Sequence, residues 1–130
     1  MMEKKILVVD DSRFIFEEMK FKMKDSEEYK IAYYCPDGEG LLAAYEKYQP
    51  DLVTVDIVMP GIDGIEASRR LLDKHPEARV IIVTSMVFDD TMEEAEQIGA
   101  LGFLPKPFET SDMIKSFDLA FQKHSLENPV

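Results

Sequence analysis

Carboxylate side chains that could bind a metal ion stand directly after two apolar runs of the sequence. Asp10 and Asp11 follow the run Ile6–Val9, and Asp56 follows the run Leu52–Val55. Mg²⁺ prefers oxygen ligands and is held in proteins by one or two carboxylates, several waters and a phosphate oxygen. If the three acids converge, they therefore predict a magnesium site.

Two further polar side chains follow the last two apolar runs. Thr84 comes directly after Val80–Val83, and Lys106 comes two residues after Gly102–Leu104. Two unit charges about 4 Å apart interact by about 4 kcal/mol at an effective dielectric near 20, so converging carboxylates require a countercharge. The Lys106 ammonium supplies one positive charge, and a divalent ion would neutralise the remaining negative charge.

Each of these residues taken alone has a simpler explanation. An acid at the junction of a strand and a helix usually caps the helix, and a lone lysine is usually a solvated surface residue. A shared site is favoured because all of them follow strands, and the carboxyl ends of parallel strands meet at one edge of the sheet. No cluster of histidine and cysteine suggests zinc, and the single cysteine, Cys35, is expected to be a small buried thiol.

Short β-rich runs alternate with stretches of helical period along the chain. The four runs named above, together with Ile31–Cys35, are rich in Val, Ile and Leu, as strands covered on both faces require. Apolar residues at helical spacing predict five helices, each with a stripe that faces the sheet. The stripes are Ile15, Met19 and Met23; Leu41, Leu42, Tyr45 and Tyr48; Ile65, Leu71 and Leu72; Met92, Ala95 and Ile98; and Met113, Ile114, Phe117 and Phe121. This alternation is typical of a parallel α/β sheet.

Helix ends are marked by a second set of signals. Asp63 stands three residues before Glu66, and Thr91 stands three residues before Glu94, so both pairs resemble capping boxes at helix starts. Gly99 is expected to end the helix that precedes it.

Length and composition predict a single domain. The 130 residues are 45% hydrophobic and 32% charged, which suits one hydrophobic core. We expect residues 1–124 to form the domain and residues 125–130, where the helical period is lost, to form a C-terminal tail. The formal net charge of −11 disfavours binding to nucleic acid. No apolar run approaches the about 20 residues of a membrane span, so we expect a cytoplasmic protein with no membrane insertion.

As a set, these residues resemble a CheY-like response-regulator receiver domain from Lys4 to about His124. The resemblance implies a doubly wound, flavodoxin-like α/β fold with five parallel strands in the order 2-1-3-4-5 and five flanking helices. The residues that carry the resemblance are Val9, Asp10 and Asp11; Asp56 with the turn Met59, Pro60 and Gly61; Asp63 and Gly64; Thr84 and Ser85; and Lys106, Pro107 and Phe108.

The resemblance also implies roles for the residues of the acidic site. Asp56 would be the phosphoacceptor, and Asp10 and Asp11 would hold Mg²⁺ together with Asp56 and the backbone carbonyl of Val58. Lys106 would pair with the phosphoryl oxygens. A carboxylate can attack phosphorus, as it does in enzymes that form an aspartyl phosphate, so the chemistry agrees with these roles.

The resemblance also implies which residues change conformation after phosphorylation and which residues bind the downstream target. Thr84 would hydrogen-bond the phosphoryl group, Phe103 would move with it, and the bond between Lys106 and Pro107 would be cis. The downstream target is expected on the face made by the fourth helix, the fifth strand and the fifth helix. Its candidate residues are Met86, Val87, Phe88 and Phe103.

The implied function is a two-component switch, with a sensor histidine kinase as donor and chemotaxis as the expected pathway. Two alternatives remain open, a phosphorelay intermediate and the isolated receiver of a longer DNA-binding response regulator. Both a monomer and a phosphorylation-dependent dimer are compatible with the sequence.

We expect no enzyme beyond weak autophosphorylation and autodephosphorylation. An aspartate-nucleophile phosphatase is disfavoured, because such chemistry usually needs an acid two residues after the nucleophile, where this chain has Val58. The resemblance implies that positions 58 and 86 flank the phosphoryl group. The apolar side chains of Val58 and Met86 could not orient an attacking water there, which predicts slow dephosphorylation and dependence on an external phosphatase.

Overall fold

Strands and helices alternate along the described part of the chain. The computed structural model describes residues 3–85 and 89–127, with side chains described as far as residue 122. The strands are β1 Lys4–Val9, β2 Tyr29–Cys35, β3 Leu52–Val55, β4 Val80–Thr84 and β5 Gly102–Pro105. The helices are α1 Arg13–Lys22, α2 Leu41–Tyr48, α3 Gly64–Lys74, α4 Asp89–Gln97 and α5 Thr110–Glu127. Among the described residues, no helix is both long and apolar enough to cross a bilayer.

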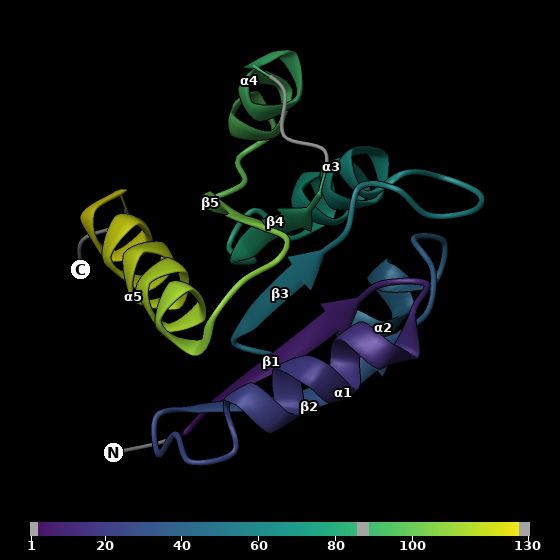
Figure 1. Ribbon diagram of the computed structural model, residues 1–130. Coiled ribbons are helices and arrows are strands. Elements are labelled where there is room, and N and C mark those ends of the chain that lie inside the picture. The colour runs from purple at the N-terminus through teal and green to yellow at the C-terminus, as the bar shows by residue number, and fades with distance from the viewer. Residues whose placement is uncertain (1–2, 86–88, 128–130) are drawn as a thin grey trace.

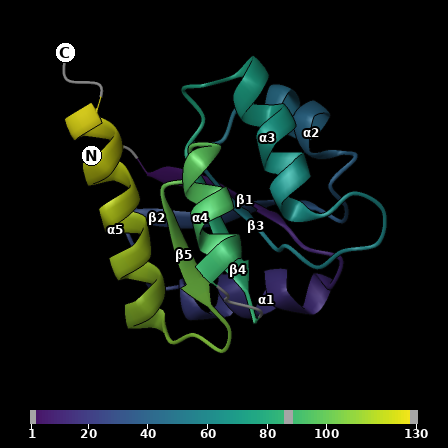
Figure 2. The same cartoon turned by 90° about the horizontal axis from the view of Figure 1, so that it is seen from above.

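The strands form one parallel sheet in the order β2-β1-β3-β4-β5 (Figure 1). Each connection between parallel strands passes through a helix, so helices cover both faces of the sheet. Figure 2 shows α2 and α3 on one side of the sheet and α1 on the other. The expected α/β fold and strand order are therefore confirmed.

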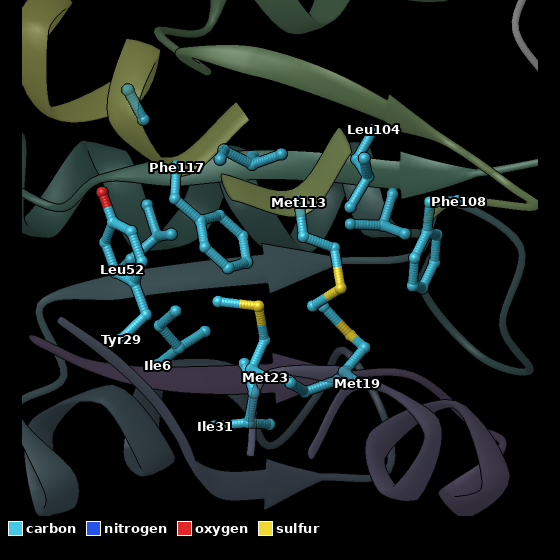
Figure 3. Packing of buried hydrophobic residues seen from close by; sticks show 14 of the residues in the cluster. Ile6, Met19, Met23, Tyr29, Ile31, Leu52, Leu104, Phe108, Met113 and Phe117 are labelled. Atoms are coloured by element: carbon cyan, nitrogen blue, oxygen red, sulfur yellow. The ribbon is translucent and has the colours of Figure 1, made fainter. Parts of the chain in front are cut away.

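Successive side chains along the strands pack alternately into two hydrophobic cores. Ile6 and Val8 face the core beneath α1 and α5, whereas Leu7 and Val9 face the core beneath α2 and α3. Figure 3 shows the first core, in which Met19 and Met23 from the α1 region meet Met113 and Phe117 from α5. Every residue of β3 and β4 is buried, Thr54 and Thr84 included, which explains why these strands are so rich in Val, Ile and Leu.

The helix signals are partly confirmed. Asp63 is the N-cap of α3, and its side chain accepts a hydrogen bond from the amide of Glu66 at 2.8 Å. Gly99 follows α4 with a φ of 103°, a left-handed conformation that suits glycine. The start predicted at Thr91 is wrong, because α4 begins at Asp89. Acids at positions 89 and 90 already place negative charge in the first turn.

Two members of the predicted apolar stripes do not face the sheet. Met92 of α4 and Ile114 of α5 are 38% and 37% exposed, whereas Ala95 and Met113 are buried. Adjacent residues such as Met113 and Ile114 point about 100° apart around a helix, so they cannot both face the sheet, and the period alone overstates the buried stripe. Helix α5 continues to Glu127, past residue 125, where we expected the helical period to be lost. Cys35 is buried, as predicted.

Candidate metal and phosphoryl site

The three predicted acids converge at the carboxyl edge of the sheet. Strands β1 and β3 are neighbours with Val9 paired to Val55, so the residues that follow them lie side by side. The amide of Asp56 donates to the carbonyl of Val9 at 3.0 Å, which extends this pairing by one residue. Carboxylate oxygens of Asp10, Asp11 and Asp56 all lie within 4.8 Å of one another. The structure thus brings together the acids that the strand ends predicted.

Burial differs among these acids. Asp10 is 2% exposed and Asp56 is 7% exposed, whereas Asp11 is exposed to solvent. Burial raises the pKa of the Asp10 carboxyl, and hydrogen bonds from the Ser12 amide and Lys106 offset part of that rise. The site is therefore a buried acidic pair with a third acid at its open side.

Lys106 supplies the countercharge to the buried pair. Its ammonium nitrogen lies 3.0 Å from Oδ2 of Asp10 and 3.2 Å from Oδ2 of Asp56. Burial alone would lower the pKa of the Lys106 ammonium, but the two carboxylates outweigh it and raise the pKa. Its backbone amide donates to the carbonyl of Thr84 at 3.0 Å, and the bond to Pro107 is cis, as predicted.

The donor set fits a magnesium ion. Three carboxylates and one ammonium leave a net charge of about −2, and all donors are oxygen atoms, which Mg²⁺ prefers. Mg²⁺ holds its ligands at about 2.1 Å, so ligands on opposite sides of the ion are about 4 Å apart. The carboxylate oxygens lie within 4.8 Å of one another, which is compatible with a shared ion, and Mg²⁺ keeps several water ligands of its own.

Two glycines shape the loop that connects Asp56 to α3. Gly61 has a φ of 84°, which turns the chain back towards α3. Gly64 packs so closely that a Cβ atom there would lie 2.1 Å from the carbonyl oxygen of Asp56. Its amide also donates to the carbonyl of Ile57 at 2.9 Å. These contacts hold the peptide group of Asp56 against the start of α3.

Val58 also belongs to this edge. Its amide donates to Oδ1 of Asp56 at 3.3 Å, and its side chain is 54% exposed. An apolar side chain thus stands in solvent two residues after the candidate phosphoacceptor.

The predicted switch residues lie on the last two strands. Thr84 ends β4 beside Pro105 of β5 and is 1% exposed. Phe103 pairs with Ile82 and packs, partly buried, against the core beneath α2 and α3. Residues 86–88, which include the proposed partner-surface residues Met86, Val87 and Phe88, lie outside the described part of the chain.

Two contacts at the site were not predicted from the sequence. The hydroxyl of Tyr34 donates to the carbonyl of Asp10 at 2.7 Å. The ammonium of Lys22 donates to the carbonyl of Phe108 at 2.5 Å, in the loop that follows Lys106. Both reach backbone carbonyls from distant elements, and no spacing rule in the sequence marks such a contact.

Comparisons with known proteins agree with this geometry. Residues 6–118 match the family model of the response regulator receiver domain. Protein CcdB of Bacillus subtilis is 38% identical over 112 residues, which are 86% of this chain and 92% of that protein. The chemotaxis protein CheY of Listeria monocytogenes is 33% identical over 116 residues, 89% of this chain and 97% of that protein.

A solved structure shows the same likeness. In the crystal structure of a CheX–CheY–BeF3–Mg complex from Borrelia burgdorferi, the matched chain is 28% identical to this one with a TM-score of 0.83. The match covers 91% of this chain and 89% of that chain. Fold, acidic cluster and sequence matches lead to one conclusion: the chain belongs to the response regulator receiver domain family of two-component systems.

Proposed function

We propose that this receiver domain accepts a phosphoryl group on Asp56 from a phosphohistidine of a sensor kinase and then changes its affinity for a downstream protein. The observation that carries the proposal is the position of Asp56. Its buried carboxylate lies 3.2 Å from the Lys106 ammonium and within 4.8 Å of the Asp10 and Asp11 carboxylates. A nucleophile, a countercharge and an oxygen-lined cation site thus meet at one point.

In the proposed transfer, a carboxylate oxygen of Asp56 bonds to phosphorus as the bond between phosphorus and the kinase histidine nitrogen breaks. The nitrogen keeps the electron pair, and the product on this chain is an acyl phosphate. Lys106 pairs with the transferring oxygens, because its ammonium already lies beside Asp56 from the loop directly after β5. Mg²⁺, held by Asp10, Asp11, Asp56 and the carbonyl of Val58, would neutralise the charge that remains on those oxygens.

The phosphorylated state differs from the unmodified state in its contacts. A phosphoryl group adds a charge of about −1.5 to −2 and three acceptor oxygens. The Thr84 hydroxyl is well placed to donate to one of them, because β4 ends between Asp56 and the strand that leads to Lys106. We propose that Phe103, which lies on β5 two residues before the Pro105 that pairs with Thr84, shifts with Thr84, since a modification biases two states only through a difference in contacts.

Receiver domains act as phosphoacceptor switches, and we propose that this one has only weak autophosphorylation and autodephosphorylation of its own. The exposed apolar side chain of Val58 supports slow loss of the phosphoryl group, since it cannot orient a water. An external phosphatase would then end the signal. The CheX–CheY complex from Borrelia burgdorferi shows that a chain of this fold can bind a partner protein.

For the pathway we propose chemotaxis, in the cytoplasm. The support is the likeness to the Listeria monocytogenes CheY, 97% of which is covered by the match. Residues 1–124 would form the switch and residues 125–130 the tail. The downstream protein would bind the face of α4, β5 and α5 that includes Phe103, and the phosphorylated chain would be a monomer or a dimer.

Incubation with acetyl phosphate and MgCl₂ tests the proposal without knowledge of the kinase. Intact-mass spectrometry should show one added phosphoryl group on the wild type. It should show none on Asp56→Asn or after removal of Mg²⁺ with EDTA. A wild-type chain that gains no mass would contradict the proposal, and an Asp56→Asn chain that gains the same mass would contradict the assignment of the acceptor.

A further inference from the structure

Tyr34 reaches from β2 to the end of the neighbouring strand β1, where the acidic site begins. It lies on β2, and its hydroxyl donates a hydrogen bond of 2.7 Å to the carbonyl of Asp10, the residue that follows β1. Its ring is half-buried, 5.3 Å from the ring of Phe16 and 5.4 Å from the guanidinium carbon of Arg13. Both neighbours belong to α1, so the ring is held in place by the helix that follows the acids.

An irregularity in β2 places the Tyr34 side chain on the α1 face of the sheet. Ile6 of β1 pairs with Ile31, but the next residue, Leu7, pairs with Tyr33, so β2 carries one extra residue at Ala32. Side chains of a regular strand alternate between faces, and Tyr33 would then share the face of Ile31. With the extra residue, Tyr33 packs against the core beneath α2 and α3. Tyr34 instead packs with Ile31 against the core beneath α1.

The Asp10 carbonyl matters because it belongs to the peptide group that joins Asp10 to Asp11. Three other contacts hold Asp10: its amide donates to the carbonyl of Cys35, and its carboxylate accepts from Ser12 and Lys106. The bond from the Ser12 amide closes a turn around the peptide that leads to Asp11, but none of these three contacts engages the carbonyl of that peptide. Among the described residues, the Tyr34 hydroxyl is the side-chain group seen to bond that carbonyl. It therefore constrains how the exposed Asp11 carboxylate is placed relative to the buried Asp10 carboxylate.

We infer that Tyr34 is a positioning residue for the divalent cation: its hydroxyl holds the turn between Asp10 and Asp11 in the conformation that binds Mg²⁺. The inference rests on the proposed function, because it assumes that these acids bind the ion. Tyr34 itself touches neither the ion nor the phosphoryl group. Its effect is to reduce the reorganisation that the turn undergoes on binding.

Isothermal titration of the metal-free full chain with MgCl₂ tests this role. Tyr34→Phe removes the hydroxyl and keeps the ring, and we expect its Kd for Mg²⁺ to rise about two- to tenfold, the range for one net hydrogen bond. Tyr33→Phe is the matched control, because Tyr33 lies on the other face of the same strand, stacked on Tyr48 at a ring distance of 4.4 Å. Its Kd should equal that of the wild type.

The titration separates positioning from a general loss of stability. Urea unfolding of each variant establishes conditions in which the chain is fully folded, and under them a change in stability does not alter the Kd of the folded protein. A second readout needs no metal. The amide of Ser12 donates to Oδ1 of Asp10 at 2.9 Å, and its hydrogen exchange should be faster in Tyr34→Phe than in Tyr33→Phe.

Two results would overturn the inference in different ways. Equal Kd values for Mg²⁺ in Tyr34→Phe and wild type would overturn the positioning role and leave the proposed function intact. A wild-type chain that binds no Mg²⁺ would overturn the proposed function and this inference together.

Discussion

The Lys106 ammonium lies 3.2 Å from Oδ2 of Asp56, although 50 residues separate the two in the sequence. The same ammonium lies 3.0 Å from Oδ2 of Asp10, so one cation bridges two buried carboxylates from neighbouring strands. In the absence of a metal ion it is the group that keeps these acids from repelling one another. Its removal should therefore affect folding and cation binding in opposite directions.

Replacing Lys106 with glutamine should destabilise the metal-free protein by about 1–3 kcal/mol, because two buried carboxylates lose their charged partner. Mg²⁺ affinity should rise, since no ammonium then competes for the carboxylate oxygens. Urea unfolding without metal and calorimetric titration with MgCl₂ measure the two effects. Lys115→Gln, at an exposed position of α5, is the control and should change neither. Unchanged metal-free stability in Lys106→Gln would show that the countercharge is unimportant.

Gly64→Ala should destabilise the fold at the loop that follows the acceptor. The added Cβ would lie 2.1 Å from the carbonyl oxygen of Asp56, and relieving that overlap requires a backbone shift that costs about 1–3 kcal/mol. Gly102→Ala is the matched control, since a Cβ there meets nothing within 4 Å. Its free energy of unfolding should stay within about 0.5 kcal/mol of the wild type. Equal unfolding free energies for the two variants would contradict the close approach.

Tyr29 predicts a dependence of stability on alkaline pH. Its pKa is raised above the ordinary value of 10.0, first by burial and then by its hydrogen bond to Asp118. A raised folded-state pKa gives stability that is complete below pH 10.0 and is lost as the pH rises above that value. Tyr29→Phe should therefore be less stable than wild type by about 1 kcal/mol at pH 7, and the gap should narrow as the pH rises above 10.

Urea unfolding of the two chains at neutral pH and at several values above pH 10 measures that gap. Phenylalanine cannot ionise, so the mutant lacks the tyrosinate that stabilises the unfolded wild type in alkali. A gap that stays constant or widens with pH would contradict the assignment.

Val58→Asp should shorten the lifetime of the phosphorylated chain. The side chain at position 58 is 54% exposed beside the acceptor, so a carboxylate there can reach a water near the phosphoryl group. We expect decay at least about tenfold faster, a smaller gain than the roughly 10²–10⁴-fold that a well-positioned general base supplies. Decay of the added mass after removal of acetyl phosphate gives the rate. Met86→Glu tests the second apolar position in the same way. Equal decay rates for the wild type, Val58→Asp and Met86→Glu would contradict the claim that the apolar residues at positions 58 and 86 slow the loss of the phosphoryl group.

The alternation of runs predicted a parallel sheet, the family resemblance implied its strand order, and the acidic site follows from the two together. Parallel strands expose their carboxyl ends at one edge, so the residues after Val9 and Val55 had to meet once those strands were neighbours. The contact of Tyr34 with Asp10 could not be predicted in this way. Adjacent tyrosines at positions 33 and 34 give no alternation, and the extra residue at Ala32 that sorts them between faces has no signature in the sequence.

The central claim is that Asp56, and no other acid of the site, becomes the acyl phosphate. Sodium borohydride reduces an aspartyl phosphate to homoserine, so peptide mapping of the acetyl phosphate-treated and reduced chain locates the acceptor directly. We predict homoserine at position 56 in the presence of Mg²⁺ and unmodified aspartate at positions 10 and 11. Homoserine at Asp10 or Asp11, with Asp56 unmodified, would contradict the account.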